Sequence, residues 1–185
     1  MTAAIEVIAE VGYAKASFSR IAKRAGLSST GMISYHFAGK DDLIAECVAE
    51  IDTVTEAFMQ PRLAAADGHV AQVRAFVEAN CALVGEHPAA VRALIDIVRN
   101  GSGQSAAYFD RLALFEEHFR AGQAAGVFRP FDTHTVAIAL GSGLDAVVVS
   151  ASAAASEPAE LTRLGRELAE LYVRAIAADP EEESA

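Results

Sequence analysis

Residues 17–40, SFSRIAKRAGLSSTGMISYHFAGK, decide the fold of this chain. Apolar side chains recur here at helical spacing and predict a short helix with one apolar face. These residues are Phe18, Ile21, Ala22 and Ala25. Gly26 follows, and a residue without a Cβ atom can take the left-handed conformation that ends a helix. Ser28 is suited to cap a second short helix, in which Ile33 and Phe37 face inward. The stretch therefore predicts two helices joined by a tight turn.

The outward face of the second predicted helix carries small side chains and one aromatic hydroxyl. A projection at about 100° per residue turns Ser28, Gly31 and Tyr35 away from the inward pair. On the same projection, Met32 and Ser34 flank the outward residues, and Thr30 and His36 lie nearer the buried edge. A surface helix without a partner more often carries Glu, Lys and Arg. Small polar groups permit close approach to the major groove of DNA. The alternative is an ordinary helical hairpin within a bundle.

The residues around the hairpin resemble the N-terminal domain of TetR-family transcriptional repressors. The matching residues are Gly12, Tyr13, Ile21, Ala22, Ala25, Gly26, Ser28, Phe37, Lys40 and Leu43. The resemblance implies a three-helix, helix-turn-helix DNA-binding domain over residues 1–46. It further implies a helical body over residues 47–185 that binds a ligand and forms a homodimer. Such a protein is a transcriptional regulator that binds a palindromic operator and is released by a small, largely apolar effector.

The helical projection and the resemblance together select the residues expected to contact DNA. They are Ser17, Ser19, Ser28, Ser29, Thr30, Gly31, Met32, Ser34, Tyr35, His36 and Lys40. Lys40 is expected either to contact phosphate or to tie the hairpin by its charge. Two features depart from the family pattern. One more residue than usual lies between Gly26 and Phe37, and Ser34 holds the usual tyrosine position with Tyr35 beside it.

The net charge of −10 at first disfavours a DNA-binding protein, but the charge is unevenly distributed. Residues 1–47 carry five basic and five acidic side chains, and the remainder carries ten basic and twenty acidic ones. The basic residues of the first part lie at positions 15–24 and at position 40, beside the hairpin. Phosphate binding is local, so this distribution is compatible with DNA at one end of the chain. A helical subdomain that binds no DNA could have the same neutral charge, so charge alone leaves both alternatives open.

The remainder of the chain has helix-favouring composition and no strongly alternating β pattern. We expect an all-α protein of about nine helices, the fourth ending or bending at Pro61. No signal-peptide pattern begins the chain, and a cytoplasmic protein fits. Cys47 and Cys81 have no partner at metal-ligand spacing, and the histidines at positions 69, 87 and 118 are isolated. No catalytic constellation or phosphate loop is present, so neither enzymatic activity nor a metal or cofactor is expected.

The middle helices combine bulky apolar residues with a few polar ones, as small-molecule sites do. The residues expected to line a ligand pocket are Phe58, Met59, Phe76, Asn80, Ile95, Arg99, Tyr108, Phe115 and Phe119. A filled core with polar groups at its surface is the equal alternative.

The last two predicted helices carry long apolar stripes and are expected to form the homodimer interface. The interface residues are Leu140, Gly143, Leu144, Val147, Leu164, Leu168, Leu171 and Tyr172. Intrachain core is the alternative for these stripes. Three hypotheses for the whole chain remain: a ligand-responsive repressor, a DNA-binding dimer without a small-molecule ligand, and a helical interaction module that binds no DNA.

Overall fold

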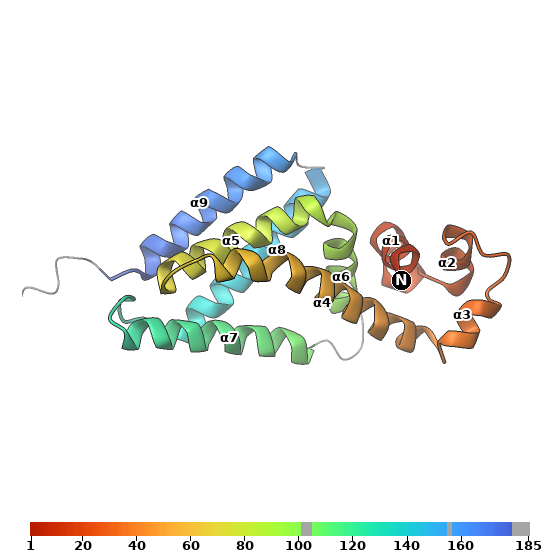
Figure 1. Cartoon of the computed structure of the whole chain (residues 1–185), viewed down its shortest axis with the longest axis horizontal. Helices are drawn as coiled ribbons and strands as arrows, with labels where there is room; N and C mark the ends of the chain where they lie inside the picture. The colour runs from red at the N-terminus through yellow and green to blue at the C-terminus, as the bar shows by residue number, and fades with distance from the viewer. Residues whose placement is uncertain (101–104, 155–156, 179–185) are drawn as a thin grey trace, which may run out of the picture. The chain divides into compact units, whose positions relative to one another are not determined.

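A computed structural model describes residues 1–100, 105–154 and 157–178, and these residues form an α-helical fold (Figure 1). The elements in order are α1 (Thr2–Val11), the 3₁₀ turn η1 (Tyr13–Lys15), α2 (Phe18–Arg24), α3 (Gly31–His36), α4 (Lys40–Ala64), α5 (His69–Glu86), α6 (Pro88–Asn100), α7 (Ser105–Ala124), α8 (Thr133–Ala154) and α9 (Pro158–Ile176). The expected all-α fold of about nine helices is confirmed. The one β feature of the described residues is an isolated bridge between Phe128 and Ala177.

Packing divides the chain into two compact units. The first unit contains Met1–Ala57 and His87–Gln104, and the second contains Phe58–Glu86 and Ser105–Ala185. Helix α6 therefore packs with the N-terminal helices, although α5 and α7 on either side of it belong to the second unit. The expected boundary between residues 46 and 47 separates a DNA-binding domain from a ligand-binding and dimerisation domain. This division by function stays a prediction.

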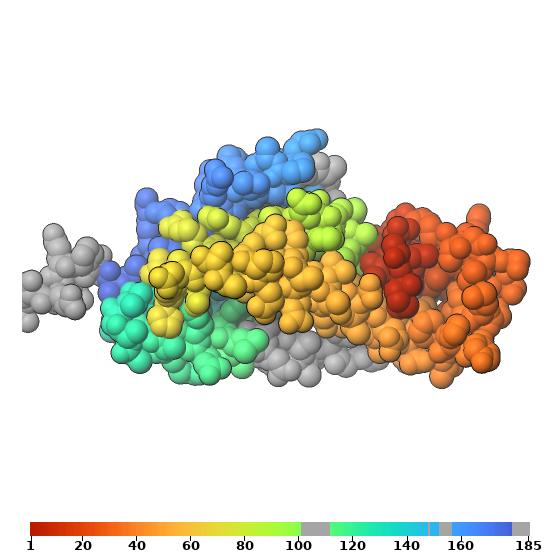
Figure 2. All heavy atoms as spheres, viewed as in Figure 1, coloured from red at the N-terminus to blue at the C-terminus, as the bar shows by residue number. Residues whose placement is uncertain are grey.

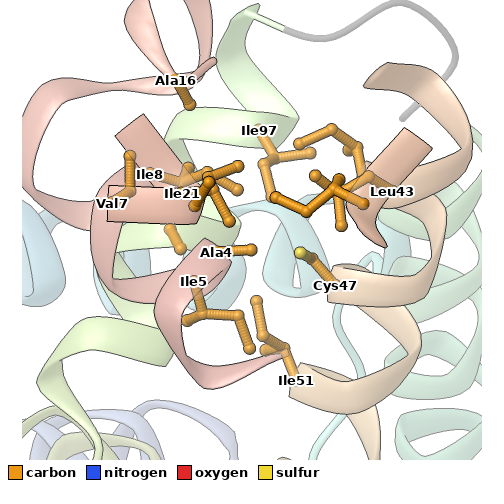
Figure 3. Close-up of a cluster of buried hydrophobic side chains, with 14 residues drawn as sticks. Ala4, Ile5, Val7, Ile8, Ala16, Ile21, Leu43, Cys47, Ile51 and Ile97 are labelled. Carbon is orange, nitrogen blue, oxygen red and sulfur yellow. The ribbon is translucent and has the colours of Figure 1, made fainter. Parts of the chain in front are cut away.

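The first unit is built around apolar side chains from α1, α2, α3, α4 and α6 (Figure 3). Its most buried members are Ile8, Cys47, Ala93 and Ile97, each fully buried, and Ile51. Ala93 and Ile97 are four residues apart on α6 and so share one helix face. This face packs mainly against α1. The core of the N-terminal unit therefore includes α6, whose first core residue, Ala93, lies 93 − 51 = 42 positions after Ile51.

The second unit is centred on α5, which packs against α9 on one side and against α8 on another, while α7 packs against α8 (Figure 1). The crossing of α5 and α9 is close because Gly165 faces Cys81. A Cβ atom added at Gly165 would lie 3.0 Å from the Cβ of Cys81. Burial raises the pKa of the Cys81 thiol, and likewise that of Cys47 in the first unit, to about 11. Both cysteines are therefore protonated packing residues at neutral pH.

The expectation that the fourth helix ends near residue 60 is wrong, because α4 continues to Ala64 with Pro61 inside it, and a bend at Pro61 stays a prediction. A proline removes a single backbone donor, and here that loss falls in the last turns of the helix. The following turn is closed by a hydrogen bond from the Ala65 amide to the Pro61 carbonyl oxygen, 3.3 Å. The Arg62 guanidinium also donates to the Phe58 carbonyl oxygen at 2.7 Å and covers the Phe58 ring.

Candidate nucleic-acid interface

Helix α2 begins and ends with well-defined caps. The Ser17 hydroxyl accepts a hydrogen bond from the Arg20 amide at 3.4 Å. At the other end Gly26 has a φ of +71°, and the Leu27 amide donates to the Ala22 carbonyl oxygen at 2.8 Å. A left-handed glycine with this hydrogen bond is a Schellman motif, which closes the helix and reverses the chain. The predicted helix end at Gly26 is confirmed, but Ala25 is exposed rather than part of the buried face.

Helix α3 starts later than expected. The prediction that Ser28 caps it is wrong, because Thr30 holds the N-cap position and the helix begins at Gly31. Residues 28–30 are Ser, Ser and Thr, all of them capping types, but Thr30 makes no side-chain cap hydrogen bond. The Ser29 hydroxyl accepts a hydrogen bond from the Gly31 amide at 3.3 Å in the turn that leads into α3. The helix is consequently only six residues long.

The two faces of α3 differ sharply in exposure. Ile33 is 6% exposed within the core, whereas Tyr35 is 85% exposed and Met32 is 60% exposed. Ser34 is exposed as well. His36 is also exposed, which corrects its expected place near the buried edge, and its ring lies edge-on to Tyr35 with centroids 5.2 Å apart. The outward surface of α3 therefore carries no Asp, Glu, Lys or Arg and has an aromatic ring at its centre. The space-filling view shows atoms of this orange segment at the surface (Figure 2).

Lys40, the first residue of α4, is tied to the 3₁₀ turn. Its ammonium group donates to the carbonyl oxygen of Tyr13 and, at 3.4 Å, to that of Ala14. The same nitrogen lies 4.3 Å from the centroid of the Tyr13 ring, a cation–π distance. Lys40 is expected from the sequence either to contact phosphate or to tie the hairpin by its charge, and these contacts are of the second kind. An ammonium group has three donors, so one remains for a phosphate.

Arg24 is held by acidic residues of α1. Its guanidinium donates to the carboxylate of Glu6 at 3.0 Å and to that of Glu10. The hydrogen bond from Arg24 lowers the pKa of Glu10, and the two carboxylates raise the pKa of Arg24. Within the described part of the chain, Lys15, Arg20 and Lys23 have no acidic partner. Together with the remaining donor of Lys40, these three cations are available to phosphate near the hairpin.

The eleven residues predicted to contact DNA all lie in the N-terminal unit, between the cap of α2 and the start of α4. Nine of them are exposed, and Thr30 and Lys40 are half-buried. Sequence reasoning missed the contribution of α6. Asp96 of that helix accepts a hydrogen bond from the Tyr13 amide, and no local pattern links residues 83 positions apart.

The residues expected to line a ligand pocket are divided between the two units. Ile95 and Arg99 lie on α6 in the first unit, and Arg99 is exposed. In the second unit Phe76 and Phe115 pack edge-on at 4.9 Å, and Phe119 is 1% exposed. The other members there are Phe58, half-buried, Met59, buried, and Asn80, half-buried, with its amide bonded to the Phe76 carbonyl oxygen. The side chain of Tyr108 lies outside the described residues. The pocket stays a prediction.

An open groove of about 570 Å³ lies between α5 and α9, apart from this aromatic cluster. Charged side chains of both signs line it together with Leu171: Arg74, Glu78, Arg166, Glu167, Glu170 and Arg174. Glu170 binds Arg74 at 2.8 Å and Arg174 at 2.7 Å, and these two hydrogen bonds lower its pKa. The groove is therefore a solvated ion-pair surface. Among the described residues, no group of three or more His, Cys, Asp or Glu side chains is placed to hold a metal ion.

The residues expected at a dimer interface fall into two groups. Leu140, Leu144 and Val147 of α8 are 2–8% exposed and belong to the core of a single chain. Gly143 lies under Tyr172 of α9. The other three, Leu164, Leu168 and Leu171, also lie on α9, and of these Leu171 is 63% exposed. The structure thus assigns much of the α8 stripe to intrachain packing.

Helix α8 nevertheless leaves an apolar face uncovered. Ile138 and Val149, three helical turns apart on one stripe, are 39% and 40% exposed. Over Thr133–Ala151 the helix has the length and mean hydropathy, 1.5, of a membrane span, yet it packs on α5 and α7. Only 35% of that window is buried within one chain. These two side chains, with Ser142 and Asp145 between them at helical spacing, make this face a candidate interaction surface.

Comparisons with known sequences agree on the first part of the chain. Residues 1–47 match the sequence model of the family described as bacterial regulatory proteins, tetR family. The HTH-type transcriptional regulator BetI 1 of Chromohalobacter salexigens is 49% identical over 49 residues, 26% of this chain and 24% of that protein. BetI of Stenotrophomonas maltophilia is 38% identical over 79 residues, 42% of this chain and 40% of that protein. The matches thus span about a quarter to two fifths of these relatives.

Comparison with solved structures extends the likeness to most of the chain. The transcriptional regulator FadR from Bacillus subtilis, solved in complex with stearoyl-CoA, superposes with a TM-score of 0.73. The superposition covers 93% of this chain and 95% of that one, at 21% sequence identity. At this identity the likeness establishes the fold and leaves the ligand and the DNA sequence of this chain to other evidence.

Proposed function

We propose that this chain, whose N-terminal domain belongs to the tetR family of bacterial regulatory proteins, is a cytoplasmic transcriptional repressor. It binds a pseudo-palindromic DNA operator as a homodimer and is released by a small, largely apolar effector. The observation that carries the proposal is α3, whose outward face presents Tyr35, 85% exposed, among small polar residues. A tyrosine and small hydroxyls on a short, anchored second helix fit the major groove.

The electrostatics of the N-terminal unit support DNA as the partner. Lys15, Arg20 and Lys23 precede or belong to α2, close in sequence to α3, and are not neutralised within the described residues. The acidic excess of the chain lies beyond residue 47. Phosphate contacts made by a few cations give affinity and position, while the side chains of α3 would supply sequence discrimination.

The homodimer is supported by the uncovered face of α8. Ile138 and Val149 are each about two fifths exposed on a helix with a mean hydropathy of 1.5 over Thr133–Ala151. A two-fold interface on this face would present two copies of α3 to two half-sites. In helix-turn-helix dimers these half-sites lie about one helical turn, roughly 34–36 Å, apart or a multiple of it. Exposed Leu171 of α9 is the further apolar residue proposed for this interface.

The test of DNA binding is selection of duplexes from a random-sequence library by the purified full chain. We expect enrichment of an inverted repeat and a specific affinity at least about 10³ times that for unrelated duplex. Failure to enrich any sequence, with only weak salt-sensitive binding, would support the helical interaction module instead. Titration of the selected duplex at several salt concentrations then separates phosphate contacts from base contacts.

The effector class is proposed from the aromatic cluster of the second unit, Phe76, Phe115 and Phe119, together with the fold neighbour solved with stearoyl-CoA. Stearoyl-CoA is the probe, and acetyl-CoA is the control that lacks the apolar chain. We expect stearoyl-CoA alone to raise the melting temperature and to release the selected duplex. Release by neither compound, with DNA binding intact, would favour a DNA-binding dimer that takes no acyl ligand.

A further inference from the structure

We propose that Asp96 of α6 is a positioning residue for DNA binding, acting through Tyr13 and Lys40 on the start of α4. This inference rests on the proposed DNA-binding function. It makes α6 a required part of the DNA-binding module, although the family match ends at residue 47. All the residues involved belong to the N-terminal unit.

The first contact in this path is a helix cap supplied from a distant helix. The 3₁₀ turn η1 begins at Tyr13, and its N-cap residue is Gly12. Glycine has no side chain that could accept a hydrogen bond from the free Tyr13 amide. The carboxylate of Asp96 accepts the hydrogen bond from the Tyr13 amide instead. Capping of a free helical amide by a carboxylate is favourable both as a hydrogen bond and as a charge near the positive helix end.

Gly12 is shaped for this contact. Its φ and ψ are 82° and 156°, a backbone region that essentially only glycine adopts. A Cβ atom at this position would lie 3.3 Å from the Asp96 carboxylate. Glycine therefore both permits the backbone conformation and leaves room for the carboxylate from α6.

The second contact passes from the turn to the start of α4. The carbonyl oxygen of Tyr13, the residue whose amide Asp96 caps, accepts a hydrogen bond from the Lys40 ammonium. The Tyr13 ring lies under the same ammonium at 4.3 Å, and its hydroxyl donates to Asp41 at 3.4 Å. A single residue, Tyr13, is thus held by α6 at its amide and by α4 at its carbonyl, ring and hydroxyl.

Apolar packing fixes the helix that carries the carboxylate. Ala93 and Ile97 of α6 are fully buried in the core that also contains Ile21 of α2 and Leu43 of α4 (Figure 3). The Asn100 amide donates to the Asp96 carboxylate at 3.1 Å. Asp96 is therefore held from both sides and can act as a fixed point. The positions of α2 and α4 relative to each other set which surface meets DNA.

The test uses the full chain with Asp96→Ala, and with Asp96→Asn as the variant that keeps an acceptor oxygen. The matched control is Arg92→Ala, since Arg92 is exposed on α6 and bonds only within that helix, to the Pro88 carbonyl oxygen. Two quantities are measured at a temperature where every variant is folded. They are hydrogen exchange at the Tyr13 amide and the affinity for the duplex selected by the wild type.

We expect Asp96→Ala to speed exchange at the Tyr13 amide and to weaken duplex binding on the order of tenfold. Asp96→Asn should recover part of both losses, and Arg92→Ala should change neither. Lys40→Met should weaken binding as well, and its effect combined with Asp96→Ala should be smaller than the product of the two.

Three outcomes would overturn the proposal. In the first, Asp96→Ala leaves hydrogen exchange at the Tyr13 amide unchanged. In the second, it speeds that exchange or lowers the melting temperature but leaves duplex affinity unaltered, and in the third, the effects of the Asp96 and Lys40 variants on affinity are independent. If the wild type itself selects no duplex, the failure lies with the proposed function. In that case the exchange measurement still decides whether Asp96 caps the turn.

Discussion

Ile33 and Tyr35 lie two residues apart on α3 and point in opposite directions, the first 6% and the second 85% exposed. Ile33 is part of the core of the N-terminal unit, whereas Tyr35 contacts little besides the edge of His36. The stability of the domain and its proposed recognition of DNA therefore depend on different residues of the same six-residue helix. This separation makes the recognition surface testable without loss of the fold.

Replacement of Tyr35 by alanine is expected to weaken binding to the selected duplex by about 1–3 kcal/mol, with a smaller loss on unrelated DNA. The melting temperature should hardly change, because the side chain is exposed. Ile33→Ala is the contrasting variant and should destabilise the protein by about 2–5 kcal/mol. Fluorescence anisotropy with both duplexes measures the first effect. Equal losses on both duplexes would show that Tyr35 reads no bases.

The ion pairs of Arg24 with Glu6 and Glu10 are expected to withhold this cation from DNA. The double variant Glu6→Gln with Glu10→Gln frees the guanidinium. The slope of log affinity against log salt concentration should then steepen by about one. The control, Glu46→Gln with Glu50→Gln, changes the net charge equally at exposed positions on α4. Equal slopes in the two double variants would place Arg24 away from the phosphates.

A local signal predicted the end of α2 at Gly26, and the failures at other helix ends have physical causes. Gly26 has a φ of +71°, a conformation that favours glycine and closes the helix. The start of α3 was missed because Ser28, Ser29 and Thr30 are equally good caps in sequence.

Long-range packing accounts for the other differences. Apolar periodicity placed Leu171 on the α9 stripe expected at the dimer interface, and it did not indicate that the buried residues of α9 include Gly165 and Ala169. Small residues at a close helix crossing carry no hydrophobic signal, although they allow α9 to approach Cys81 of α5. The pairing of Asp96 with Tyr13 was equally out of reach. The outward direction of Tyr35, by contrast, followed from helical geometry alone.

The exposed stripe of α8 predicts how dimerisation can be disrupted. Ile138→Glu should give a folded monomer, because Ile138 is 39% exposed and a carboxylate there cannot be buried without a partner. Leu114→Glu, at a 66% exposed position of α7, should stay dimeric and is the control. Analytical ultracentrifugation gives the mass of each. A dimeric Ile138→Glu protein would place the interface on another surface.

Gly143 and Tyr172 are expected to be strongly coupled in stability. The Tyr172 hydroxyl donates to the Ala139 carbonyl oxygen at 2.6 Å, and a Cβ atom at Gly143 would lie 2.6 Å from that hydroxyl. Gly143→Ala should therefore destabilise the wild type by about 1–3 kcal/mol. In a Tyr172→Phe background the nearest ring atom is 3.5 Å away, an ordinary contact. There the same change should stabilise the helix by up to about 1 kcal/mol. Urea denaturation of the four proteins measures the sign reversal.

His118 is expected to make the second unit sensitive to acid. Burial lowers the pKa of its imidazole, which lies 5.1 Å from the His69 ring and 6.1 Å from that of Phe128. In the unfolded chain this imidazole binds a proton at the usual histidine pKa of about 6.5, whereas in the folded protein it binds the proton only at a lower pH. This contribution to stability is complete above about pH 6.5 and is lost as the pH falls below that value.

The measurement is the free energy of unfolding in urea at about pH 7.5 and about pH 5.5. His118→Gln should reduce the loss of stability between the two values, because its side chain takes up no proton there. Its amide can replace the hydrogen bond of the imidazole to the His69 carbonyl oxygen, 3.2 Å in the wild type. His36→Gln removes an exposed histidine and controls for the number of titrating groups. If both variants lose as much stability on acidification as the wild type, another group carries the acid sensitivity.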